Sequence, residues 1–290
     1  MTERTVVCWN ATMAADAALA WAVERESGRN GTITIIDVVD SGVYLGDVEA
    51  LDPVYEAQEQ ERLDVRIAQL RITAPQLAVR SSVLVADPLD ALFAETSPRT
   101  LVVVGTERRT GPRARFGWSF GARLAAAANG PVAIVPATDP DEPRRVGIVV
   151  GIDGTSVGDH ALEFAAREAS RRGEPLTIVH AWLEPLAWQP TAVPDDDFVE
   201  STDRARRELL DDRVRTVGRR HAGLTIESVL VHGEPVIALR EAGRTATAVV
   251  VGSRRLGRWR RAWLGSVSHG VILELVSPVI VVGPEGEHHD

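Results

Sequence analysis

The segment IVVGIDGTSVGDHALEFAAREASRRGEPLTIVHAW, residues 148–182, decides the fold of this chain. It opens and closes with short runs of apolar, largely β-branched residues, and such runs indicate buried strands. Between them lies a stretch with helical spacing of its apolar residues, with Thr155 or Ser156 as candidate N-cap and Gly173 after its end. The segment therefore predicts a strand, a helix and a second, parallel strand.

The same pattern occurs once more, near the start of the chain. TVVCWNATMAADAALAWAVERESGRNGTITIIDVV, residues 5–39, aligns with residues 148–182 without gaps at an offset of 143. Later blocks match at an offset of 147, VVVGTERRTG with VVVGSRRLG and NGPVAIVP with VSPVIVVGP. The chain is therefore a tandem duplication, with a linker rich in Pro and Asp near 138–145. We predict two domains, 1–140 and 144–290.

Each copy alternates β-branched runs with longer amphipathic stretches, which predicts an α/β fold of two tandem doubly wound domains. Continuous runs such as AVVVG indicate parallel strands that are buried on both faces. Ser266 or Ser268 is the candidate N-cap of the last helix, which we expect to end near Val276. In the second copy we expect strands at 146–152, 175–182, 224–232, 247–252 and 278–283.

Composition excludes several classes of function. The 290 residues carry a net charge of -9, which argues against nucleic acid as a main partner. No apolar run is long enough to span a membrane and no signal peptide opens the chain, so we expect a soluble, cytoplasmic protein. All 32 basic residues are arginines, so the lysine of a P-loop, a kinase or a Schiff-base enzyme is absent.

In their order, three groups of motifs resemble a universal stress protein domain: GIDGTSVGDHALEFA after the first strand, HGEPVIAL before the third helix, and VVVGSRR, LGSVS and SPVIVV at the end. The resemblance covers nearly the whole chain as two such domains. It implies five-stranded parallel sheets of order 3-2-1-4-5, with the ends of strands 1 and 4 as neighbours. It also implies pairing of the last strands, 131–136 with 278–283, into an intramolecular pseudo-dimer, with a further homodimer or a regulatory protein partner beyond it.

Family members of the ATP-binding type carry a glycine-rich phosphate loop and an Asp after strand 1. Glycines let backbone N–H groups approach phosphate, and a helix N-terminus adds a favourable dipole. The second copy keeps this pattern except at Arg255, which replaces the second loop glycine. The resemblance implies a site for an adenine nucleotide, ATP with or without Mg²⁺, at Asp153, Gly154, Thr155, Val179, His180, Ala181, Gly252, Ser253, Arg254, Arg255, Gly265, Ser266, Val267 and Ser268.

The first copy departs further from the family pattern. Asn10 stands in place of the Asp, and Arg108 and Trp118 replace the second and third loop glycines. Only Gly105 and Ser119 match. We therefore expect the first copy to be a degenerate partner that binds no nucleotide.

Other motifs favour ordinary structural roles. GWSFG at 117–121 matches G-x-S-x-G, but no strand precedes it as a serine hydrolase requires. The aspartates at 195–197 precede a helix expected near Phe198, where carboxylates favour the helix dipole. No residue set places a general base on a nucleophile, so slow ATP hydrolysis is the most activity we expect. The sequence predicts a nucleotide-binding regulatory module; the alternative is an interaction scaffold whose arginines at 254–261 dock an acidic partner.

Overall fold

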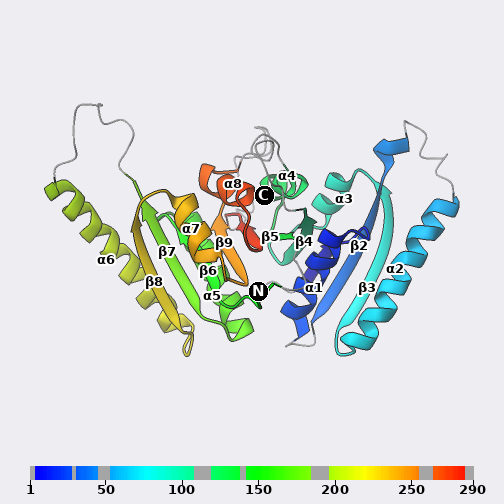
Figure 1. Ribbon diagram of the computed structural model, residues 1–290, viewed down its shortest axis with the longest axis horizontal. Helices are drawn as coiled ribbons and strands as arrows, with labels where there is room; N and C mark the ends of the chain where they lie inside the picture. Colours follow the sequence, from blue (N-terminus) through cyan, green and yellow to red (C-terminus); the bar gives the residue numbers. More distant parts are fainter. Residues whose placement is uncertain are drawn as a thin grey trace, which may run out of the picture. The chain divides into compact units, whose positions relative to one another are not determined.

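The computed structural model describes residues 4–27, 31–44, 53–107, 119–137, 142–183, 196–254 and 264–284. They divide into two compact units, unit 1 within Met1–Glu142 together with Leu264, and unit 2 formed by Pro143–Arg254 and Gly265–Pro284. Each unit is a parallel sheet with helices packed on its faces (Figure 1). Among the described helices, none combines the length and the apolar character that crossing a bilayer would require.

Unit 1 has the strand order β3-β2-β1-β4-β5, and its paired strands run parallel. Its elements are β1 Arg4–Cys8, α1 Met13–Ser27, β2 Thr32–Asp40, the 3-10 helix η1 Ser41–Tyr44, α2 Pro53–Thr73, β3 Ala78–Ala86, α3 Pro88–Ala94, β4 Thr100–Thr106, α4 Phe120–Ala127 and β5 Val132–Pro136.

Unit 2 repeats this topology, with strand order β8-β7-β6-β9-β10. Its elements are β6 Ile148–Ile152, α5 Ser156–Arg172, β7 Leu176–Trp182, α6 Asp196–Arg220, β8 Ile226–His232, α7 Pro235–Gly243, β9 Ala248–Gly252, α8 Ser266–Leu273 and β10 Val279–Val282. The predicted α/β fold class is confirmed, and each strand of unit 2 lies within its expected range.

The sheets are buried as their apolar runs predict. Most residues of the central strands are buried, in β1 and β4 of unit 1 and in β6 and β9 of unit 2. In unit 2, α5 packs on β6 and β9, whereas α7 packs on β6 and β7.

The helix ends of unit 2 agree with the sequence at α5 and differ at α8. Thr155 is the N-cap of α5, where its side chain accepts a hydrogen bond from the Gly158 N–H, and Gly173 closes the helix with a φ of 64°. The prediction for α8 was wrong: Gly265 is its N-cap, without a side-chain cap, and the helix ends at Leu273. The backbone leaves the helix at Glu274, whose φ of -101° and ψ of 32° are not helical, so the helix does not reach Val276.

Candidate functional site

A cavity of about 360 Å³ lies in unit 2 at the carboxyl ends of β6 and β9. These two strands are neighbours although they are not consecutive, so the strand order reverses between them. Open α/β sheets bind ligands at this switch point. Residues from β6, β7 and β9, from the first turns of α5 and α8, and from α7 line the cavity.

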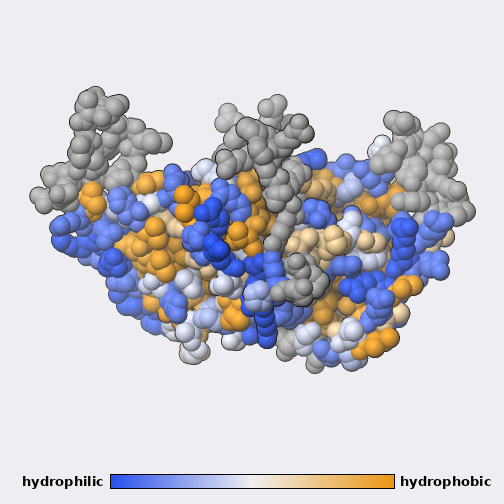
Figure 2. Space-filling view, in the orientation of Figure 1, coloured by the Kyte–Doolittle hydropathy of each residue, from blue (hydrophilic) through white to orange (hydrophobic). Residues whose placement is uncertain are grey.

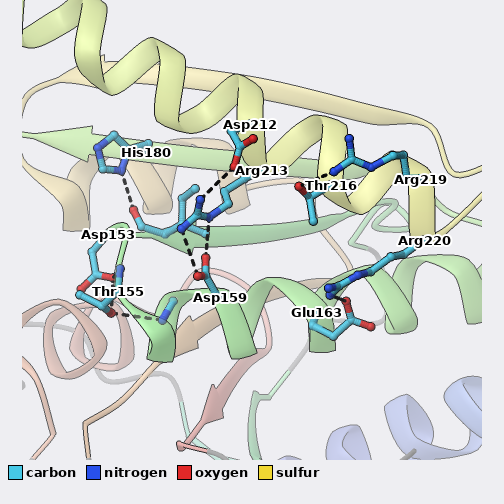
Figure 3. A network of polar contacts seen from close by, with 12 residues as sticks. Asp153, Thr155, Asp159, Glu163, His180, Asp212, Arg213, Thr216, Arg219 and Arg220 are labelled. Atoms are coloured by element: carbon cyan, nitrogen blue, oxygen red, sulfur yellow. Dashed lines mark hydrogen bonds and ion pairs between the residues drawn. The ribbon is translucent and has the colours of Figure 1, made fainter.

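One side of the cavity carries a carboxylate that is held by its own loop. Asp153 Oδ1 accepts hydrogen bonds from the Thr155 backbone N–H at 3.0 Å and the Thr155 hydroxyl at 2.6 Å (Figure 3). Its other oxygen, Oδ2, lies 3.5 Å from the guanidinium of Arg254, and both side chains are more than half exposed. Asp153 is therefore oriented by the loop, while Oδ2 stays open to a further hydrogen-bond donor.

The other side of the cavity is formed by the beginning of α8. Gly265, Ser266, Val267 and Ser268 line it. The first N–H groups of a helix have no acceptor within the helix, and the N-cap Gly265 offers none from a side chain. Backbone donors and the positive end of the helix dipole thus adjoin the cavity, together with Arg254, and this combination suits an anion.

Two glycines shape the cavity in different ways, and this difference gives a first prediction. A Cβ at Gly252 would lie 2.9 Å from the carbonyl oxygen of Val157, whereas a Cβ at Gly265 would meet nothing closer than Ser268 Oγ at 3.5 Å. We expect Gly252→Ala to lower the free energy of unfolding by about 1–3 kcal/mol through overpacking. Gly265→Ala, the matched control, should change it by less than about 0.5 kcal/mol. Equal losses in urea titrations of the two variants would contradict this account.

Of the residues predicted for the site, the structure brings ten together around this cavity. They are Asp153, Thr155, Val179, Ala181, Gly252, Arg254, Gly265, Ser266, Val267 and Ser268. Their roles in binding stay predictions. Arg255 lies outside the described residues, as does the rest of the arginine cluster up to Arg261.

Three predicted residues do not line the cavity. Side chains alternate along a strand, so His180 points away from the face that Val179 and Ala181 present. Its Nδ1–H donates to the Ile152 carbonyl at 2.8 Å, and the residue is 2% exposed (Figure 3). Gly154 has a φ of 79° and would place a Cβ 2.9 Å from Leu209 of α6. Ser253 is 1% exposed and donates its N–H to the Val282 carbonyl at 2.8 Å.

The structure adds lining residues that the sequence reasoning missed. Pro235 and Leu239 come from α7, one helical turn apart, and Leu239 lies against Gly151. The motif HGEPVIAL already marked this helix, so its i, i+4 spacing was an available signal. The remaining additions are neighbours of predicted residues along the chain, namely Gly151, Ile152, Val157, Gly158 and Val251.

Unit 1 keeps the turn that follows its first strand. Asn10 accepts a hydrogen bond from the Thr12 hydroxyl at 2.9 Å, as Asp153 does from Thr155. Ala11 has a φ of 56° at the position of Gly154, so the left-handed turn persists without its glycine. Ser119 is the N-cap of α4, which gives the serine of GWSFG a structural role. Arg108 and Trp118 lie outside the described residues.

Unit 1 has a wider cavity in a different place, of about 950 Å³ between α1 and α2. Trp9, Met13 and Val65 are among its lining residues, and none of the residues that match the family's phosphate loop lines it. Among the described residues, no cluster of three or more His, Cys, Asp or Glu side chains is placed to hold a metal ion.

Comparisons with known proteins agree with this architecture. The family model described as universal stress protein family matches residues 1–136 and 147–283. A universal stress protein of Mycobacterium tuberculosis is 29% identical over 95% of both chains, and one of Mycolicibacterium smegmatis is 28% identical over 93% of both. The crystal structure of a universal stress protein from Archaeoglobus fulgidus shares the fold, with a TM-score of 0.69 at 18% identity over 98% of this chain and 100% of that chain. The chain therefore belongs to the universal stress protein family and carries two of its domains in tandem.

Proposed function

We propose that unit 2 binds an adenine nucleotide, with ATP as the preferred ligand, and that the protein works as a nucleotide-dependent regulatory module in the stress response. The observation that supports this most is the single cavity that adjoins both Asp153 and the uncapped beginning of α8. A carboxylate accepts hydrogen bonds from ribose hydroxyls or the adenine amino group, whereas helix N–H groups bind phosphate. A nucleotide needs both.

The lining residues suit binding more than catalysis. The described residues around the cavity include no histidine and no cysteine, and Asp153 is the one carboxylate among them. A general base poised on a nucleophile is therefore not part of this lining. Mg²⁺ would be held by the nucleotide phosphates with the Ser266 and Ser268 hydroxyls or Asp153 nearby, because Mg²⁺ commonly shares its ligands with substrate phosphates.

We expect affinity to increase from adenosine to AMP to ATP and to fall as salt is added. Adenosine leaves the α8 end of the cavity without a partner, and salt screens the attraction between Arg254 and phosphate. Calorimetric titration of the full chain with each ligand measures this order, and mass spectrometry of material released on denaturation identifies any nucleotide that co-purifies. No heat with ATP and no co-purified nucleotide would refute the proposal. The substitution of the loop glycine by Arg255 would then favour the scaffold function.

A further inference from the structure

Helix α2 of unit 1 presents an apolar face to solvent. Val65 is 55% exposed and Ile72 is 80% exposed, and the exposed Ala68 lies between them. Residues spaced i, i+3 and i+7 lie on one side of a helix. Figure 2 shows hydrophobic colouring over the carboxyl-terminal part of α2. We call Val65, Ala68 and Ile72 the α2 stripe.

The duplicated helix α6 shows that the fold does not require this stripe. The buried pairs Leu63 with Leu210 and Leu70 with Val217 align the two helices at an offset of 147. Two ion pairs that tie each helix to the one before it also correspond: Arg66 binds Asp16 at 3.1 Å and Arg213 binds Asp159 at 2.7 Å, with the arginines related by the offset of 147 and the aspartates by the offset of 143.

At this offset the stripe positions of α6 are all charged: Asp212, Arg215 and Arg219. Figure 3 shows Asp212 and Arg219 on α6. The fold therefore tolerates charged, solvated side chains at these three helix positions. Because unit 1 places three apolar residues there instead, the stripe calls for a reason outside the unit itself.

Charged residues beside the stripe indicate what covers it. Asp64 and Arg71 flank it, seven residues apart on one edge. Arg71 forms no ion pair or side-chain hydrogen bond within the described part of the chain, and Asp64 accepts one hydrogen bond from Gln60 at 2.9 Å. If two copies of α2 cross antiparallel at Ala68, Val65 packs on the partner's Ile72, and Asp64 lies beside the partner's Arg71. The small Ala68 lets the helices approach closely at the crossing point.

We propose that the α2 stripe is a homodimer contact in which α2 packs antiparallel on α2 of a second copy. The face complements itself in both respects, apolar against apolar and acid against base, and an isologous contact requires this property. A lipid surface would favour a stripe bordered by basic residues, whereas Asp64 borders this one. The proposal goes beyond nucleotide binding and is independent of it.

Sedimentation equilibrium of the full chain over a concentration series tests the proposal. We expect a species of twice 31.4 kDa to form as concentration rises. Ala68→Arg and Ile72→Arg each introduce the residue of α6, and each should raise the dimer dissociation constant at least about thirtyfold. Arg219→Ala on α6 is the matched control and should leave the constant unchanged.

A charge exchange separates this contact from any other dimer. Arg71→Asp places acid against acid and should raise the dissociation constant about tenfold, and adding Asp64→Arg should restore it. Both positions are exposed, and thermal unfolding of each variant verifies that unit 1 stays folded. A chain that stays monomeric at every concentration, or a dimer that Ala68→Arg leaves intact, would overturn the proposal.

Discussion

Replacing Asp153 with alanine is expected to weaken ATP binding by about 1.5–3 kcal/mol, or about 10- to 150-fold in the dissociation constant. Oδ2 of Asp153 is the acceptor in the cavity that the loop leaves open, and Oδ1 is occupied by Thr155. Asp153→Asn keeps an oxygen for Thr155 but removes the charge. It should therefore preserve the loop and still weaken binding, which separates loss of a ligand contact from collapse of the turn.

Asn10 provides the matched control, because it holds the same position in unit 1 and makes the same hydrogen bond to the following threonine. Asn10→Ala should leave the ATP dissociation constant unchanged, since no described cavity of unit 1 places Asn10 beside a helix beginning. Calorimetry on the three variants measures the difference. Equal weakening by Asp153→Ala and Asn10→Ala would mean that unit 1 also binds nucleotide.

The second large effect is a dependence of the stability of unit 1 on pH. Asp37 of β2 is 3% exposed, and Glu59 of α2 is 6% exposed. Burial, followed by the charge of Glu59, raises the pKa of Asp37 from 3.8 to about 6, while Arg62 acts in the opposite direction. Asp37 Oδ2 accepts no hydrogen bond from the described residues. The ionised carboxylate is therefore poorly accommodated in the folded state.

The sign of the effect follows from proton binding. Between about pH 4 and pH 6 the folded state holds the Asp37 proton and the unfolded state has lost it, so the free energy of unfolding falls as pH rises. A pKa raised by about 2 units lowers the free energy of unfolding by about 3 kcal/mol well above pH 6. About 1.4 kcal/mol of this loss occurs between pH 5 and pH 7.5.

Urea denaturation of Asp37→Asn and the unchanged chain at these two pH values measures the effect. The amide does not titrate, so we expect the stability of the variant relative to the unchanged chain to improve by about 1.4 kcal/mol on going from pH 5 to pH 7.5. A relative stability of Asp37→Asn that does not change with pH would contradict the interpretation of Asp37 as a carboxyl destabilised by burial.

The sequence by itself determined the duplication, the fold class and the ends of α5. These features depend on local patterns: apolar runs bury a strand on both faces, Thr155 caps the next helix, and Gly173 ends it with a left-handed turn. The sequence also predicted much of the candidate site, because the residues that follow successive parallel strands meet at one edge of a sheet.

Only the tertiary structure decided which of these residues face the cavity and what completes it. Side chains alternate along β7, so Val179 faces the cavity and His180 faces the opposite side of the sheet. The helices that cover the two faces of the sheet decide which of the two residues faces the cavity. Leu239 reaches Gly151 because α7 packs back over β6 and β7. Asp37 and Glu59 lie 22 positions apart in the sequence, and they interact as buried charges because α2 packs on β2. Contacts between segments that are distant in the sequence create each of these features.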